Sequence, residues 1–310
     1  MKTVFFGTPE FAVPPLQALM GSGHDVIAVV TQPDRRKGRG KHFSSSPVKA
    51  EAEKQGVKVL QPEKVKDRSF IDELRELKPE AIILVAYGQI LPNEIIHLPE
   101  YGCINVHASL LPKYRGASPI NRAIIDGEKK TGITTMLMDE GMDTGPILLQ
   151  KEIDIDPDDT AGSLSIKLAE AGSRLLLRTL EGIEKNTLTP VPQPEGASYA
   201  PLLSKTDGFI PWEKSAEVIC NFIRGMTPWP AAYGFLEGER IKILKALPCD
   251  KDGERGLITA IEKNTIVVGA GQGSISILEI QPAGKPAMSA GAFIRGRDMK
   301  EGMRFSISND

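Results

Sequence analysis

The first 186 residues alternate short apolar runs with longer amphipathic segments, and this alternation limits the folds open to the chain more than any other feature. Runs rich in Val, Ile and Leu are predicted strands: Val4–Phe6, Asp25–Thr31 and Glu80–Ala86. The segments between them are predicted helices: Phe11–Met20, Pro47–Gln55 and Asp67–Leu77. Because parallel strands covered on both faces are almost continuously apolar, the pattern predicts an α/β domain with a largely parallel sheet.

Two more strands and a long helix complete this first region. The strands are predicted at Gly102–His107 and Gly132–Met138, and leucines at helical spacing predict a helix over Asp158–Asn186. The pattern then breaks at four prolines within residues 187–206, which predict a semi-extended linker. The expected organisation is a domain of residues 1–189, a linker of residues 190–206 and a second domain of residues 207–310.

The second domain has a different texture, with several short strands at close spacing. The predicted strands are Arg240–Ala246, Gly256–Ile261, Asn264–Gly269 and Gly273–Gln281, and a predicted helix, Ser215–Gly225, precedes them. Such a pattern indicates a small β-barrel or sandwich.

Composition excludes several classes of protein. With 41% hydrophobic residues, 25% charged residues and a net charge of −2, the chain is not collagen-like or wholly disordered. We expect no membrane association, because no apolar run approaches the ~18 residues of a spanning helix. The start of the chain is expected to be a strand rather than a signal peptide. Three widely spaced cysteines fit no metal or disulfide pattern, so we expect a reducing cytoplasm.

Candidate chemistry lies where the fourth predicted strand, Gly102–His107, ends. Asn105 and His107 are two residues apart, so they project from the same face at the edge where α/β sheets bind ligands. An amide beside an imidazole can stabilise an oxyanion, and a carboxylate would orient the imidazole. Asp143, in a glycine-bearing loop after the next strand, could supply it, although Glu140 competes for the role. The alternative interpretation is that all of these are ordinary turn residues.

Two motifs resemble the signature of the folate-dependent formyltransferases. They are Asn-Val-His-Ala-Ser-Leu-Leu-Pro-Lys-Tyr-Arg-Gly over Asn105–Gly116 and Met-Asp-Glu-Gly-Met-Asp-Thr-Gly-Pro over Met138–Pro146. The resemblance implies a Rossmann-like domain that transfers a formyl group from 10-formyltetrahydrofolate without a metal. It assigns catalysis to Asn105, His107 and Asp143. It assigns the tetrahydrofolate site to four consecutive residues, Ser109, Leu110, Leu111 and Pro112.

Three other segments resemble the members of that family that act on initiator methionyl-tRNA. They are Gly7–Ala12, Thr31–Lys41 with the following Ser46–Lys49, and Arg224–Ala232. Residues 35–41 are called the basic segment. The basic segment has five cations within seven residues: Arg35, Arg36, Lys37, Arg39 and Lys41. This resemblance implies that the basic segment contacts tRNA, with Arg39 foremost, and that the second domain is an OB-like β-barrel used on tRNA. A solvated basic surface loop is the alternative interpretation.

The implied activity is formylation of the α-amino group of methionyl initiator tRNA. A UDP-4-amino-arabinose formyltransferase or another folate-dependent amine formyltransferase is the alternative within the family. A nucleotide-dependent oxidoreductase is disfavoured because Gly7-Thr8-Pro9 is not a G-x-G-x-x-G turn. A non-catalytic RNA-binding module would leave Asn105, His107 and Asp143 without a role. We expect a monomer.

Charge in the second domain does not by itself indicate RNA binding. Residues 207–310 contain thirteen Lys or Arg and thirteen Asp or Glu, which gives no net charge. Any RNA contact there requires the cations to gather on one face. The candidates are Lys242, Lys245, Arg295, Arg297 and Arg304.

Overall fold

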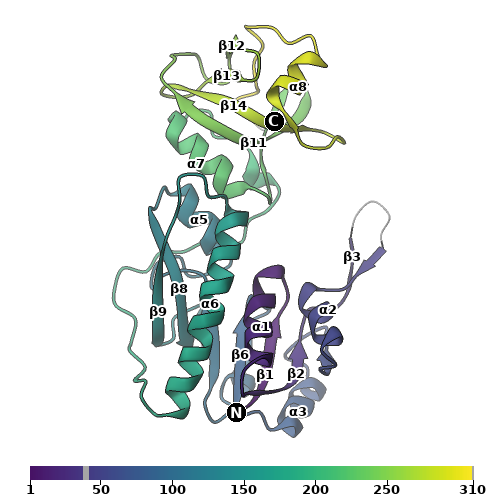
Figure 1. Cartoon of the computed structure of the whole chain (residues 1–310), viewed down its shortest axis with the longest axis vertical. Coiled ribbons are helices and arrows are strands. Elements are labelled where there is room, and N and C mark those ends of the chain that lie inside the picture. The colour runs from purple at the N-terminus through teal and green to yellow at the C-terminus, as the bar shows by residue number, and fades with distance from the viewer. Residues whose placement is uncertain (38–41, 309–310) are drawn as a thin grey trace. The chain divides into compact units, whose positions relative to one another are not determined.

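The structure is a computed structural model that describes residues 1–37 and 42–308, with only the backbone described at positions 36, 37, 42 and 43 (Figure 1). The chain forms two compact units. The first comprises Met1–Pro119, Thr131–Asp154 and Ser165–Ala200; the second comprises Ile120–Lys130, Ile155–Leu164 and Pro201–Asp310. The second unit thus takes two short segments that lie between parts of the first unit in the sequence. The domain limits expected from the sequence stay a prediction.

A largely parallel sheet is the centre of the first unit, as predicted. Its strand order is β5-β2-β1-β6-β7-β8-β9. The bounds are β1 Lys2–Gly7, β2 Asp25–Val30, β5 Val59–Leu60, β6 Ala81–Val85, β7 Cys103–His107, β8 Lys130–Leu137 and β9 Ile147–Asp154. The strands from β5 to β7 pair in parallel, and β8 pairs antiparallel to β7. The buried, continuously apolar strands explain why the sequence indicated a covered parallel sheet.

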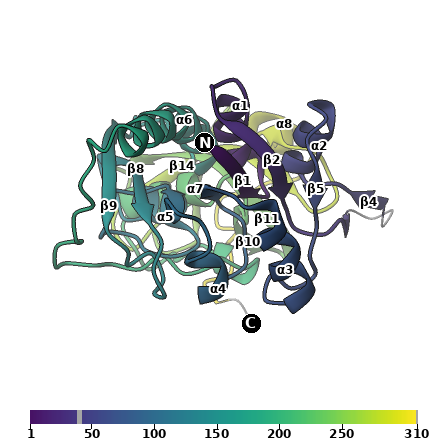
Figure 2. The same ribbon diagram turned by 90° about the horizontal axis from the view of Figure 1, so that it is seen from below.

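Helices cover both faces of this sheet (Figure 2). One face carries α1 (Val13–Met20), α2 (Pro47–Lys54) and the long α6 (Ala161–Glu184); the other carries α3 (Arg68–Leu77) and α4 (Asn93–Ile96). A short 3-10 helix, η1 (Glu10–Ala12), precedes α1, and α5 spans Pro119–Ile125. On the α3 side the ring of Phe6 packs edge-on against Phe70 and Tyr87. The core therefore lies between the strands and amphipathic helices, as the 3.6-residue periodicity predicted.

The second unit is an antiparallel β structure. Its strand order is β10-β11-β14-β13-β12, and β15 pairs with β14. The bounds are β10 Ala232–Leu236, β11 Glu239–Cys249, β12 Ile258–Ile261, β13 Ile266–Gly269, β14 Ser274–Pro282, β15 Met288–Ser289, α7 Ala216–Met226 and α8 Ala290–Arg295, with a 3-10 helix η2 at Thr206–Gly208. The C-terminal segment bridges both edges, since Phe305 pairs with Leu236 of β10 and Arg304 pairs with Leu257 just before β12. This closure matches the small barrel predicted for the region.

The basic segment is more ordered at its ends than predicted. The sequence indicated a loop, whereas β3 (Arg35–Lys37) pairs antiparallel with β4 (His42–Ser44). Arg39 and Lys41 lie outside the described residues. Strand pairing was missed because each strand has three residues, too few for an alternating pattern to show.

In the described ranges no helix is both long enough and apolar enough to cross a bilayer.

Candidate active site

Asn105 and His107 lie together at the carboxyl end of β7. Both side chains are buried, with 6% of each residue exposed. Val106 between them faces the other way, where a Cβ added to Gly172 of α6 would lie 3.1 Å from its Cγ1. The two-residue period of the strand therefore turns Asn105 and His107 away from α6 and toward the same side, as predicted.

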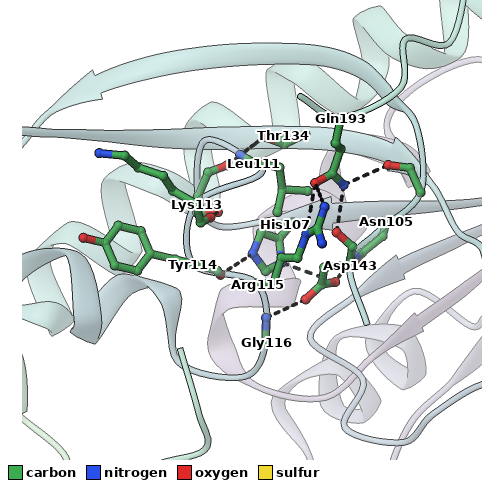
Figure 3. A network of polar contacts seen from close by, with 12 residues as sticks. Asn105, His107, Leu111, Lys113, Tyr114, Arg115, Gly116, Thr134, Asp143 and Gln193 are labelled. Carbon is green, nitrogen blue, oxygen red and sulfur yellow. Dashed lines mark hydrogen bonds and ion pairs between the residues drawn. The ribbon is translucent and has the colours of Figure 1, made fainter. Parts of the chain in front are cut away.

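Asp143 closes on both of these side chains from the loop between β8 and β9 (Figure 3). Its Oδ1 accepts a hydrogen bond from Asn105 Nδ2 at 3.2 Å and lies 3.6 Å from His107 Nδ1. Its Oδ2 accepts a hydrogen bond from the backbone N–H of Gly116 at 2.7 Å. The Asp143 side chain is 15% exposed, so the carboxylate meets these groups with little water around it. A single oxygen thus faces both the amide and the imidazole.

Local sequence explains how the Asp143 loop reaches the strand. The backbone N–H of Leu137 donates to the carbonyl of Pro146 at 3.0 Å, which closes the loop at its base. Gly145 is needed there because an added Cβ would lie 1.8 Å from the Leu137 carbonyl oxygen. Asp143 itself has φ of 55°, a left-handed conformation that Asp and Asn adopt more readily than most residues.

The hydrogen bonds of His107 indicate where its protons lie. His107 Nε2 is 3.0 Å from the carbonyl oxygen of Tyr114, and a carbonyl can only accept, so Nε2 carries a hydrogen. In the neutral ring the lone pair is then on Nδ1, which faces Asp143. A proton gained by this imidazole would therefore be placed on Nδ1, 3.6 Å from the Asp143 carboxylate.

The other acids of the same loop are engaged elsewhere. Glu140 accepts a hydrogen bond from Asn93 Nδ2 at 2.7 Å. Asp139 accepts from the Thr144 hydroxyl at 2.6 Å and from the Gly141 backbone at 3.1 Å, which makes it part of the loop's own turn. Of the acids in this loop, the structure brings Asp143 to the β7 pair, although its catalytic role stays a prediction.

In the part of the chain that is described, no cluster of three His, Cys, Asp or Glu residues could hold a metal ion.

The segment Ser109–Pro112 follows β7 directly and is held by polar contacts from β8 and β9. Thr134 links it twice: its hydroxyl donates to the Ser109 carbonyl at 2.7 Å and accepts from the Leu111 N–H at 3.1 Å. Gln150 Nε2 donates to the Leu111 carbonyl at 2.9 Å. Ser109 and Leu111 are buried, Leu110 and Pro112 are half-buried, and the Leu111–Pro112 peptide is cis. The backbone of the predicted folate segment is thereby fixed beside the Asn105–His107 pair.

The most informative residues that the sequence did not reveal are Arg115 and Gln193. Gln193 Nε2 donates to the carbonyls of Asp143 and Gly145, at 2.7 and 2.8 Å. Its Oε1 accepts from Arg115 Nε at 3.1 Å and Arg115 Nη2 at 2.7 Å. Gln193 lies in the stretch predicted to be a linker, where its only sequence signal is a polar residue between two prolines.

The base of the basic segment is tied to the first unit by Asp34. Its carboxylate pairs with Lys49 Nζ at 2.7 Å and accepts from Gln61 Nε2 at 2.8 Å. These two hydrogen bonds, Lys49 first, hold the pKa of Asp34 below its ordinary value. Arg35 begins β3 directly after this anchor, and its side chain is exposed.

Two of the predicted cations in the second unit are neutralised by neighbouring acids. Arg297 pairs with Glu239 at 2.6 Å, and Arg304 pairs with Glu254. An ion-paired arginine attracts a phosphate less strongly than an unpaired one, so these two positions are weaker candidates for tRNA contact.

Comparison with known proteins places this arrangement in a family. Residues 1–180 match the formyl transferase family, and residues 202–298 match the formyl transferase C-terminal domain. The chain belongs to the formyl transferase family, as its two signature motifs predicted.

Two relatives are about half identical to this chain, and one solved structure has the same fold. The methionyl-tRNA formyltransferase of Thermodesulfovibrio yellowstonii is 53% identical over 97% of each chain. That of Caldanaerobacter subterraneus subsp. tengcongensis is 52% identical over 97% of this chain and 99% of its own. WlaRD, a sugar 3N-formyl transferase solved in the presence of dTDP and 5-N-formyl-THF, has a TM-score of 0.68 over 92% of this chain and 99% of its own. Because the sequence identity is 22%, this similarity shows a shared fold and nothing further.

Proposed function

We propose that this protein transfers the formyl group of 10-formyltetrahydrofolate to the α-amino group of methionyl initiator tRNA. The observation that carries the proposal is the meeting of Asn105 and His107 on one carboxylate oxygen of Asp143, at the ligand-binding edge of the sheet. Relatives named for this reaction are about half identical over nearly the whole chain. The sugar formyltransferases, such as WlaRD, are far more distant in sequence.

The residue types suit attack by an amine on a formyl carbon. An α-amino group titrates near ~8, so much of it is an uncharged nucleophile at neutral pH and no Ser or Cys nucleophile is needed. As the new C–N bond forms, negative charge develops on the formyl oxygen. Asn105 keeps one amide hydrogen beyond the one given to Asp143, and this hydrogen can donate to the formyl oxygen. His107 adds a positive charge beside it once Nδ1 has taken up a proton.

Asp143 and His107 also provide a place for the proton that the amine releases. The amine loses a proton as its nitrogen bonds to carbon, and the nitrogen of the folate that departs gains one. Nδ1 of His107 is the open basic position, because Nε2 is committed to the Tyr114 carbonyl. Nδ1 lies 3.6 Å from Asp143 Oδ1, so this pair can hold the proton during its transfer between the two nitrogens.

The folate is expected to lie along Ser109, Leu110, Leu111 and Pro112. The backbone of this segment is fixed by Thr134 and Gln150, so it offers a rigid edge next to the reacting groups. A rigid edge suits orientation of a formyl donor, because positioning lowers the barrier only when the bound geometry is maintained.

Arg35, Arg36, Lys37, Arg39 and Lys41 are proposed to contact the tRNA. Their number within seven residues suits phosphate contact, which supplies most of the affinity of RNA-binding segments. The ion pair of Asp34 with Lys49 fixes the backbone at the start of this segment. In this function the enzyme acts in translation initiation, hence in the cytoplasm, and we propose that it acts as a monomer.

The test compares three acceptors with 10-formyltetrahydrofolate as donor: methionyl initiator tRNA, UDP-4-amino-arabinose and glycinamide ribonucleotide. We expect transfer to the tRNA, its loss in His107→Ala, and its retention in the control His97→Ala, which changes an exposed histidine away from the site. Transfer only to a small amine would leave the chemistry in place and refute the acceptor. Full activity of His107→Ala would refute the site.

A further inference from the structure

We infer that Gln193, with Arg115, is a positioning residue that holds the Asp143 loop in its reactive conformation. The inference rests on the proposed function for its activity readout. The hydrogen bonds of Gln193 go to Arg115 and to the backbone of Asp143 and Gly145, and no contact with substrate is required of it. It acts on the backbone that carries Asp143 (Figure 3).

The amide of Gln193 is fully used by this arrangement. Its two hydrogens go to the carbonyls of Asp143 and Gly145, and its oxygen accepts both hydrogen bonds from the Arg115 guanidinium. A side-chain amide has two donors and two acceptor positions, so none is left for another partner. The orientation of the amide is therefore determined on both sides, which a solvated linker glutamine would not show.

The segment around Gln193 is built to hold this side chain still. Val191 forms a bridge with Ile147, the first residue of β9, through hydrogen bonds of 2.8 and 2.9 Å. Prolines occupy positions 192 and 194 and restrict the backbone on either side. Gln193 is half-buried, whereas its neighbours from position 191 to 197 are exposed.

Gln193 and Arg115 together form a clamp on the Asp143 loop. The residues on either side of Arg115 in the sequence contact the two side chains, His107 and Asp143. The preceding residue, Tyr114, offers the carbonyl that binds His107 Nε2. The following residue, Gly116, gives the N–H that binds Asp143 Oδ2. Gln193 and Arg115 therefore join the loop that orients His107 to the loop that carries Asp143. Displacing Gln193 would remove the two hydrogen bonds that fix the carbonyls of Asp143 and Gly145, next to a left-handed residue that lies in no regular secondary structure.

Gln193→Glu separates positioning from simple docking of the segment. The carboxylate keeps the pairing with Arg115 but has no hydrogen to donate to the carbonyls of Asp143 and Gly145. We expect Gln193→Glu and Gln193→Ala to lower kcat about tenfold, the effect of losing hydrogen bonds that maintain geometry, with little change in KM for either substrate. Glu195→Ala, at an exposed position of the same segment, is the matched control and should match the wild type.

A second readout does not depend on activity. The amide hydrogen of Gly116 is bound to the Asp143 carboxylate, so its exchange with solvent in the free protein reports the position of that side chain. We expect faster Gly116 exchange in both Gln193 variants and no further loss of kcat when Gln193→Glu is added to Asp143→Asn. Wild-type kcat and Gly116 exchange in Gln193→Glu would overturn the inference, as would additive losses in the double variant. Absence of formyl transfer by the wild-type protein would instead count against the proposed function. The exchange rate of the Gly116 amide hydrogen would then show by itself whether Gln193 positions the Asp143 loop.

Discussion

Replacing the carboxylate of Asp143 by an amide tests the central electrostatic element of the site. Asp143→Asn keeps the size and shape of the side chain and removes the negative charge that lies 3.6 Å from His107 Nδ1. The same carboxylate accepts hydrogen bonds from Asn105 Nδ2 and from the Gly116 backbone N–H. Hydrogen bonds to a charged group are worth about 1.5–3 kcal/mol each, so we take about 2–4 kcal/mol as the loss of transition-state stabilisation when the charge is removed.

That loss corresponds to a fall in the rate of formyl transfer of roughly 30- to 1,000-fold, since each 1.36 kcal/mol is tenfold. The assay is single-turnover transfer to methionyl initiator tRNA, with urea unfolding to show that the variant is folded. Glu140→Gln is the matched control, because that acid binds Asn93 rather than the β7 pair. A transfer rate for Asp143→Asn within threefold of the wild type, with unfolding unchanged, would refute the reasoning.

Three further predictions concern stability, tRNA contact and thiol reactivity. Ser46→Ala removes the hydroxyl that caps α2, and we expect a loss of about 1–2 kcal/mol in the free energy of unfolding, measured with urea. Arg39→Ala should lower kcat/KM for the tRNA, spare folate binding and reduce the salt dependence of tRNA binding by about one ion; an unchanged kcat/KM would contradict the phosphate role. Burial raises the pKa of Cys103 and of Cys220 to about 12, so at pH 8 only about one thiol in ten thousand at these positions is the reactive thiolate. A thiol-reactive dye should therefore label the native protein fastest at the half-buried Cys249, and rapid labelling of all three would contradict the burial.

The sequence by itself determined the local periodicities, and the architecture follows from them. Apolar runs and helical spacing were enough to predict the parallel sheet covered by helices, because a strand buried on both faces must be apolar along nearly its whole length. The two-residue period of β7 was likewise enough to place Asn105 and His107 on one face. The family signature then added Asp143 and the folate segment to that pair.

Only the tertiary structure decided which groups meet across long stretches of chain. Asp143 rather than Glu140 reaches Asn105, 38 residues away, because the path of the loop sets each acid's direction. Gln193 reaches Asp143 across 50 residues. No periodicity records such contacts, since they depend on how a proline-bearing segment packs against a loop closed at Gly145. What a local pattern cannot specify is the backbone route between elements, and in this protein that route completes the site.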